Sequence, residues 1–259
     1  MFMDWTIDGF LDARLQVKQP KTGFRAGSDA VLLAASVDIG PGQSLLDVGC
    51  GVGTAALCVK HRQPDCLVFG LELQSELAQM ARENAYSNKV ATGMTIFDVN
   101  IASRNDFKPL AGPTSAEFLS DHFDHVITNP PFYADGRAQT SPSEIRAKAH
   151  VEGDADLDCW IKFCMARLKP KGILSVIHRT DRLPELLTLI SADCGSIRII
   201  PLWPNAQTPA KRVLLQGVKS DKGPAMLHPG IVMHENNGKP TEIAENILRK
   251  GMALSEILN

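Results

Sequence analysis

Residues 45–54, LLDVGCGVGT, decide the fold: an apolar strand runs into an acid and then into three alternating glycines. Glycine has no Cβ, so it adopts positive φ readily and lets the backbone approach a ligand closely. Dinucleotide-binding enzymes place the last glycine of G-x-G-x-x-G over a pyrophosphate at a helix N-terminus. Here Gly53 comes one residue early and Thr54 holds that place, which argues against NAD. The acid before the loop, Asp47, instead suits a ligand that carries an amino group.

Strands and helices alternate along the chain that surrounds this loop. The predicted strands are residues 45–48, 67–71, 94–97, 123–128, 173–178, 197–201 and 213–217, and the predicted helices include residues 30–37, 54–59 and 75–85. This alternation predicts an α/β fold with a doubly wound, mostly parallel, seven-stranded sheet whose last strand is antiparallel. Ligands of such sheets bind at the carboxyl ends of the strands. Asp47, Glu72 and Asp98 end three consecutive strands there, so we expect a ligand with several hydrogen-bond donors.

The composition limits the possible architectures and partners. A chain of 259 residues with 44% hydrophobic residues can bury one large core, so we expect one main domain. We divide the chain into an N-terminal extension with the first helix (residues 1–40), a cofactor-binding core (residues 41–220) and a C-terminal extension (residues 221–259). The formal net charge of -2 provides no global basic field. Any binding of nucleic acid therefore needs a local basic patch.

Cysteine usage and hydropathy indicate the compartment. The six cysteines form no C-x-x-C pair and no His/Cys cluster with zinc-ligand spacing, so we expect buried thiols and no metal site. No apolar run approaches the roughly 18 residues of a membrane span. Residues 1–10 carry acids where a signal peptide carries bases. We therefore expect a soluble, cytoplasmic protein.

The second decisive stretch is residues 129–133, NPPFY, directly after the fourth predicted strand. Its two prolines remove two backbone donors and favour extended geometry. The side-chain oxygen of Asn129 and the carbonyl of Pro130 would accept the two N–H groups of a planar exocyclic amine, such as adenine N6. That contact would turn the lone pair of the amine toward a methyl donor. Phe132 or Tyr133 would stack on the base, which contributes about 1–3 kcal/mol.

Basic residues provide candidates for contacts with RNA. Residues 13–28 hold Arg14, Lys18, Lys21 and Arg25 without a single acid. Such a run either grips phosphates or is a solvated face. A second basic group follows the NPPFY stretch and consists of Arg137, Arg146, Lys148 and His150. By contrast, Leu157, Trp160, Ile161, Cys164 and Leu168 recur at helical spacing and predict a core-facing helix.

Both motifs resemble those of a known enzyme class. The pattern D-x-G-x-G-x-G at residues 47–53 resembles the first motif of class I S-adenosylmethionine-dependent methyltransferases, and N-P-P-F at residues 129–132 resembles the catalytic motif of amino methyltransferases. Further matches look like the bacterial tRNA1(Val) adenine-N6 methyltransferases, which act next to the anticodon of a valine tRNA. These matches are residues 19–20, residues 23–33, Gly136, residues 141–142 and residues 146–150. The likeness covers nearly the whole chain.

This resemblance implies a cofactor, a substrate and roles for individual residues. The cofactor would be S-adenosylmethionine. The substrate would be an RNA, with tRNA as the leading candidate. Asp47, Gly49, Gly51 and Gly53 would hold the methionine part of the cofactor, Glu72 its ribose hydroxyls and Asp98 its adenine amine, with Asn129 also at the cofactor. Asn129, Pro130, Pro131 and Phe132 would be catalytic, and Phe132, Tyr133, Arg25, Arg146 and His150 would bind the substrate. The family usually has tyrosine at the position of Phe132, so Phe132 and Tyr133 both stay candidates for stacking on the base.

Three other functions stay open. A glutamine-N5 protein methyltransferase shares the N-P-P-F motif, but those enzymes resemble chains with a larger helical N-terminal domain. A guanine-N2 rRNA methyltransferase tends to carry a duplicated domain that 259 residues do not hold. A catalytically silent cofactor-binding scaffold is the third alternative, and the intact Asn-Pro-Pro-Phe sequence argues against it.

Overall fold

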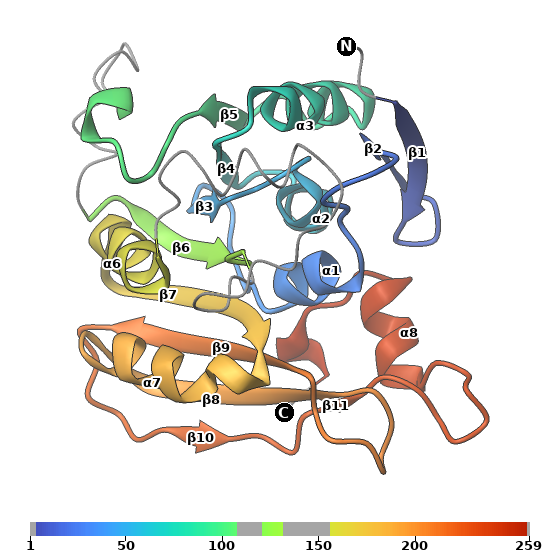
Figure 1. Cartoon of the computed structure of the whole chain (residues 1–259), viewed down its shortest axis with the longest axis vertical. Coiled ribbons are helices and arrows are strands. Elements are labelled where there is room, and N and C mark those ends of the chain that lie inside the picture. Colours follow the sequence, from blue (N-terminus) through green and yellow to red (C-terminus); the bar gives the residue numbers. More distant parts are fainter. Residues whose placement is uncertain (1–3, 108–120, 132–155, 258–259) are drawn as a thin grey trace.

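The computed structural model describes residues 4–107, 121–131 and 156–257. A nine-stranded sheet lies at its centre (Figure 1). The strands are β1 (Trp5–Phe10) and β2 (Leu15–Pro20) in a separate hairpin, and β3 (Ser44–Val48), β4 (Leu67–Glu72), β5 (Met94–Asp98), β6 (Phe123–Thr128), β7 (Leu168–Arg179), β8 (Cys194–Trp203), β9 (Arg212–Lys219), β10 (Met226–Leu227) and β11 (Ile231–Val232) in the large sheet. The α-helices are α1 (Ser28–Ala35), α2 (Thr54–Arg62), α3 (Ser75–Ser87), α6 (Leu157–Arg167), α7 (Leu183–Ser191) and α8 (Glu242–Leu248). Three short 3-10 helices are η1 (Arg104–Phe107), η2 (Thr180–Arg182) and η3 (Leu254–Glu256).

The order across the large sheet is β10-β8-β9-β7-β6-β3-β4-β5, with β11 also paired with β8. Strands β3 to β7 are parallel to one another, and β9 runs antiparallel between β7 and β8, as predicted. The expected number of seven strands was too small, because the C-terminal segment adds β10 and β11 alongside β8. The chain winds from β3 toward β5 in one direction and from β6 toward β8 in the other. The crevice outside β3 and β6 is therefore the topological switch point, where open α/β sheets bind ligands.

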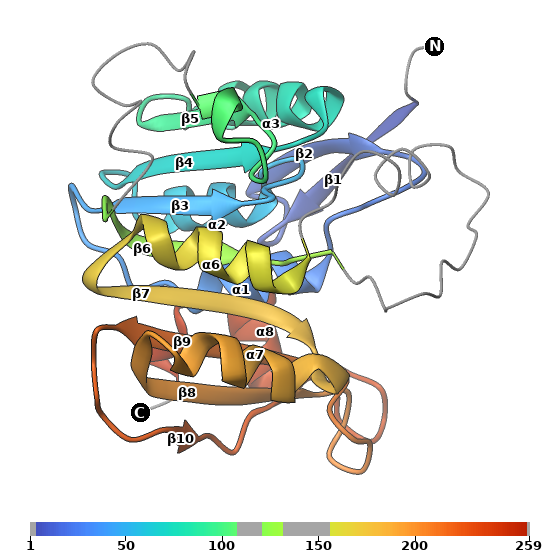
Figure 2. The same ribbon diagram turned by 60° about the vertical axis from the view of Figure 1, so that its left-hand side comes forward.

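Helices cover both faces of this sheet (Figure 2). α6 and α7 pack on one face, and α1, α2, α3 and α8 lie on the other. All five residues of β3 are buried, as expected for a parallel strand that is covered on both sides. Two clusters of buried apolar side chains, one on each face, form the core. Within the described ranges, no helix is long and apolar enough to cross a membrane.

The hairpin of β1 and β2 packs against α3 through β2 (Figure 1). Its turn contains three consecutive residues with positive φ, namely Leu11 (50°), Asp12 (57°) and Ala13 (60°). This left-handed conformation costs about 1–2 kcal/mol for each residue that has a Cβ. Leu11 is 2% exposed and contacts Gly251 near the other end of the chain. Burial of this side chain offsets part of the strain in the turn.

Two element boundaries differ from the sequence predictions. β7 begins at Leu168, although residues 169–172, KPKG, predict a turn. The register between β6 and β7 shifts across this stretch, so the turn residues form an irregularity inside a paired strand. The N-cap of α1 is Gly27, so this helix begins at Ser28, before the predicted start at residue 30. The carboxylate of Asp29 forms an ion pair of 2.9 Å with the guanidinium of Arg212.

Candidate functional site

The glycine loop between β3 and α2 forms one wall of the crevice. Gly49, Gly51 and Gly53 have φ values of 72°, 56° and 83°, which residues with a Cβ rarely adopt. The N–H groups of Gly49 and Cys50 both donate to the carbonyl of Leu71, at 2.8 and 2.9 Å. These two bonds anchor the loop to β4. Gly53 then serves as the N-cap of α2, so the loop leads directly into a helix N-terminus.

Asp47 lies at the base of this loop and is only 3% exposed. The N–H of Ala56 donates to its carboxylate, but among the described residues its Oδ2 has no hydrogen-bond partner. Burial raises the pKa of Asp47 from 3.8 to about 7; the bond from Ala56 opposes this rise, and the charge of Glu72 adds to it. A buried acceptor without a partner is unfavourable. The carboxylate is therefore suited to a ligand that brings a cationic donor.

Glu72 and Asp98 share the same rim because they are opposite each other in the register of β4 and β5. The carboxylate of Glu72 accepts hydrogen bonds from the N–H groups of Gly51 and Gln74, both at 2.9 Å. Burial raises the pKa of Glu72 above its ordinary value, whereas Asp98 is exposed. The three predicted acids thus end adjacent strands. Leu73, which is 41% exposed, adds an apolar surface beside Glu72 that the sequence analysis missed.

Asn129 and Pro130 follow the end of β6 and form the opposite wall. Val48 and Thr128 are opposite each other in the parallel pairing of β3 and β6, so Asn129 and Gly49 come next on their two strands. In the part of the chain that the structure describes, Oδ1 of Asn129 is buried and has no hydrogen-bond partner. The crevice therefore has an unpartnered acceptor on each wall, one from a carboxylate and one from an amide.

Trp160, in the first turn of α6, connects the two walls. Its indole Nε1 donates to Oγ1 of Thr128 at 2.7 Å, and Oγ1 of Thr128 donates to the carbonyl of Val48 at 2.8 Å. The indole also lies against Gly49, where an added Cβ would come within 2.8 Å of Cζ2. The helical spacing predicts Trp160 as a core residue, and it is instead half-buried at the crevice. Spacing alone gives no signal for this position, because the contact depends on the end of a strand from another part of the chain.

Two further residues support the glycine loop from segments that are distant in sequence. The ring of Phe24 lies on the loop, with Cε1 3.1 Å from the point that a Cβ on Gly51 would occupy. The buried side chain of Asn84 in α3 donates to the carbonyl of Val52 at 3.0 Å. Asn84 also exchanges two hydrogen bonds with the backbone of Lys18, at 2.8 and 2.9 Å. No sequence pattern indicates these roles of Phe24 and Asn84, although Gly23 and Gly27 on either side of Phe24 are typical of a loop.

Three residues of the basic stretch, Lys18, Lys21 and Arg25, have ion-pair partners within the chain, whereas the guanidinium of Arg14 donates to the carbonyls of Leu11 and Arg249. The guanidinium of Arg25 donates to the carbonyl of Pro20 at 2.5 Å and pairs with Asp8. Lys18 pairs with Glu83 at 2.7 Å, across the boundary between β2 and α3. These acids lie outside residues 13–28. The folded surface around the stretch is therefore less positive than the +4 charge of its own residues. Binding of RNA by Arg25 stays a prediction.

Four predicted substrate-binding residues lie outside the described residues, and their roles also stay predictions. They are Phe132, Tyr133, Arg146 and His150. Pro131 is described and is half-buried. Over the described ranges, no group of three His, Cys, Asp or Glu side chains has an arrangement suited to a metal ion.

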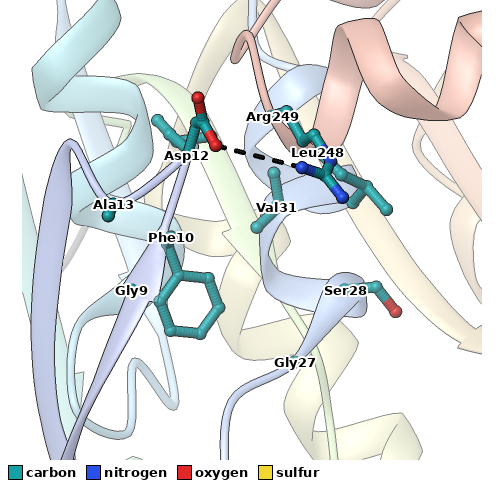
Figure 3. A pocket seen from close by; sticks show the side chains of 10 residues that line it. Gly9, Phe10, Asp12, Ala13, Gly27, Ser28, Val31, Leu248 and Arg249 are labelled. Carbon is teal, nitrogen blue, oxygen red and sulfur yellow. Dashed lines mark ion pairs between the residues drawn. The ribbon is translucent and has the colours of Figure 1, made fainter.

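A cavity of about 410 Å³ lies between the hairpin turn, α1 and the end of α8 (Figure 3). Phe10, Val31 and Leu248 contribute apolar lining, and an ion pair of 3.9 Å joins Asp12 to Arg249. Both charged partners are largely exposed. The lining elements differ from the strand ends that carry the two unpartnered acceptors, so we do not place the candidate active site here.

Comparison with known proteins shows similarity to methyltransferases. A family model described as the methyltransferase small domain matches residues 23–150. The tRNA1(Val) (adenine(37)-N6)-methyltransferase of Aeromonas hydrophila is 27% identical over 227 residues, which are 85% of this chain and 89% of that relative. A protein of the same name from Porphyromonas gingivalis is 29% identical over 204 residues, which are 75% of this chain and 76% of that relative.

Solved structures show the same architecture. A predicted O-methyltransferase from Agrobacterium tumefaciens, protein Atu636, superposes with a TM-score of 0.69 at 22% identity and covers 87% of this chain and 97% of its own. TYW2 of Pyrococcus horikoshii, in complex with MeSAdo, gives a TM-score of 0.53 at 12% identity and covers 84% and 72%. At these identities the likeness concerns the fold alone. It confirms the doubly wound α/β sheet predicted from the sequence.

Proposed function

Because the chain is a class I S-adenosylmethionine-dependent methyltransferase with a methyltransferase small domain, we propose that it methylates the N6 amine of an adenine in a tRNA. The observation that carries this proposal is the position of Asn129-Pro130-Pro131 beside the glycine loop, with an unpartnered, buried amide oxygen on Asn129. The names of the relatives from Aeromonas and Porphyromonas support the same reaction. With tRNA as its substrate, the enzyme would work in the cytoplasm.

The described residues fit S-adenosylmethionine. When bound, this cofactor supplies an electrophilic methyl group on a sulfonium. The free Oδ2 of Asp47 would accept a hydrogen bond from the ammonium of the methionine part, and Gly49, Gly51 and Gly53 would leave room for it. Glu72 already accepts two backbone N–H groups, but a carboxylate offers about four lone-pair positions. Glu72 would therefore still have lone pairs that accept hydrogen bonds from the ribose hydroxyls. Asp98 would accept a hydrogen bond from the adenine amine of the cofactor.

Asn129 and Pro130 would prepare the substrate amine. The lone pair of adenine N6 is delocalised into the ring, which makes the free amine a poor nucleophile. Oδ1 of Asn129 and the carbonyl of Pro130 would accept its two N–H groups and hold it in the orientation for transfer, and positioning of this kind supplies much of the catalytic effect. No general base is needed, since the methylated amine loses its proton to water. A base in a folded RNA would have to leave the stack to reach the crevice, where Phe132 or Tyr133 would stack on it.

Methylation of defined substrates tests the proposal. The purified enzyme is incubated with labelled S-adenosylmethionine and unmodified total tRNA, with parallel reactions that contain ribosomal RNA or a release-factor protein. Nucleosides and peptides are then analysed by mass spectrometry. We expect N6-methyladenosine in the tRNA sample. Label in N2-methylguanosine or in a glutamine side chain would instead support one of the alternative amino methyltransferases, and label in none of the samples would contradict the proposal.

The variant Asn129→Ala separates catalysis from cofactor binding. Loss of the amide oxygen is expected to abolish methyl transfer, because the amine is no longer oriented. The affinity for S-adenosylhomocysteine, measured by calorimetry, should remain close to that of the wild type. A parallel loss of cofactor affinity would contradict the role assigned to Asn129.

A further inference from the structure

The hydroxyl of Thr128 occupies the point where β3 and β6 separate. Thr128 is the last residue of β6, and its register partner Val48 is the last residue of β3. Beyond this pair, the glycine loop turns toward β4 because Gly49 donates its N–H to Leu71. Oγ1 of Thr128 donates to the carbonyl of Val48 at 2.8 Å. This bond ties the two strand ends together at the last position before their loops diverge.

Trp160 reaches the same point from a helix on one face of the sheet. Its indole N–H, 2.7 Å from Oγ1 of Thr128, fixes which way the hydroxyl proton points, because an oxygen that accepts from the indole directs its own proton to Val48. The six-membered ring of the same indole lies against Gly49, the first residue of the glycine loop, through Cζ2 and Cη2. The first turn of α6, which carries Trp160, is stabilised by its N-cap, because the carboxylate of Asp156 accepts from the N–H of Cys159 at 2.8 Å.

From these contacts we infer that Trp160 and Thr128 form a clamp that sets the separation between the glycine loop and Asn129. Both are positioning residues, because their hydrogen bonds are to each other and to the backbone of Val48. The clamp rests on the proposed function in one respect, since its purpose is to hold the methyl donor and the target amine at their reacting distance. Gly49 follows Val48 and Asn129 follows Thr128, so the clamp acts one residue away from each wall.

A role in positioning predicts a specific pattern in the kinetics. Thr128→Val removes both hydrogen bonds and keeps the shape of the side chain, and Trp160→Phe removes the indole N–H and keeps an aromatic ring. Each change is expected to lower kcat about tenfold to a hundredfold, because a displacement of about 1 Å has effects of that size. The Kd for S-adenosylhomocysteine should change less than about threefold, since the loss affects the reacting geometry and not the binding of either partner alone.

Three further variants make the test specific. Thr128→Ser keeps the hydroxyl and should restore most of kcat. The double variant Thr128→Val with Trp160→Phe should be no slower than the slower single variant, because both changes break the same chain of hydrogen bonds. Trp203→Phe is the matched control: it removes an indole N–H that donates to the carbonyl of Pro229 at 3.0 Å, at the end of β8. This control should keep the kcat of the wild type.

A readout without methyl transfer keeps the clamp testable even if the substrate differs from tRNA. The chain has three tryptophans, so its indole N–H groups give few resonances in nitrogen-15 NMR spectra, and Trp160→Phe identifies one of them. Thr128→Val should shift that resonance and accelerate its hydrogen exchange, whereas addition of S-adenosylhomocysteine to the wild type should slow the exchange. Failure to methylate tRNA would defeat the proposed function and leave this result intact. Three results would overturn the clamp. They are a wild-type kcat in Trp160→Phe, losses of kcat that multiply in the double variant, and an indole resonance that does not respond to Thr128→Val or to S-adenosylhomocysteine.

Discussion

Replacement of Asp47 by asparagine should stabilise the cofactor-free enzyme while it weakens cofactor binding. Burial raises the pKa of this carboxyl from 3.8 to about 7. Its charged form is thus less favourable in the folded protein than in the unfolded chain, where the pKa is ordinary. The difference of about three between the two pKa values corresponds to about 4 kcal/mol of unfolding free energy. Asparagine has nearly the same shape and no charge, so it removes this penalty.

The stabilisation should depend on pH in a defined way. A raised folded-state pKa means that the stability associated with the protonated carboxyl is fully present below pH 3.8, declines as the pH rises, and is lost above about pH 7. The advantage of Asp47→Asn should therefore be about 2 kcal/mol at pH 5 and about 4 kcal/mol at pH 8. It should level off above pH 7, because the carboxyl is then ionised in both states.

Urea denaturation of both proteins without cofactor, between pH 5 and pH 8, measures this difference. Other titrating groups affect both proteins and largely cancel in the comparison. Calorimetry with S-adenosylhomocysteine supplies the second half of the test, in which the variant should bind more weakly. The gain in unfolding free energy of Asp47→Asn over the wild type must grow with pH. A gain that is independent of pH, or one that grows toward acid pH, would refute the assignment of Asp47 as a buried carboxylate that binds a cationic ligand.

Three other predictions follow from the contacts around the glycine loop. Gly49→Ala should abolish cofactor binding, measured by calorimetry, because the new Cβ would lie 2.8 Å from Trp160 at a φ of 72°; Gly42→Ala, also at positive φ but with no atom near its Cβ, controls for backbone strain. Asn84→Ala should lower the unfolding free energy by about 2–3 kcal/mol in urea and weaken cofactor binding, since it leaves buried backbone groups of Val52 and Lys18 unpaired; unchanged stability would contradict this role. Charge reversal at Arg14, Lys18 and Arg25 should weaken tRNA binding and reduce its salt dependence, whereas an unchanged salt slope would contradict a role of these residues in binding RNA.

The sequence predicts the architecture well because local patterns decide it. Apolar runs that end in an acid or asparagine identify β3, β4, β5 and β6 to within one or two residues. The cap of α8 is likewise local: Oγ1 of Thr241 accepts from the N–H of Ala244 at 3.2 Å. The acids at the strand ends meet at one rim because parallel strands present the same end to the same edge of the sheet.

The contacts that hold the site together could not be predicted in the same way. Trp160 has the spacing of a core residue, and its place at the crevice depends on a hydroxyl 32 positions earlier. Asn84 looks like any polar residue of an exposed helix until β2 docks on it, 66 positions away in the chain. The positive charge of the basic stretch is balanced by acids from other segments. Each of these features arises from tertiary packing, which no single-sequence periodicity records.

The left-handed turn of the hairpin has a consequence for biosynthesis. Leu11 finds its contact at Gly251, and the guanidinium of Arg14 donates to the carbonyl of Arg249. The ribosome adds Arg249 235 positions after Arg14, so the strained turn lacks these contacts while the intervening chain is made. Contacts between such distant segments also slow the search for the native state. A nascent chain that has not yet reached residue 249 would thus hold its strained turn only through the packing of the hairpin on α3.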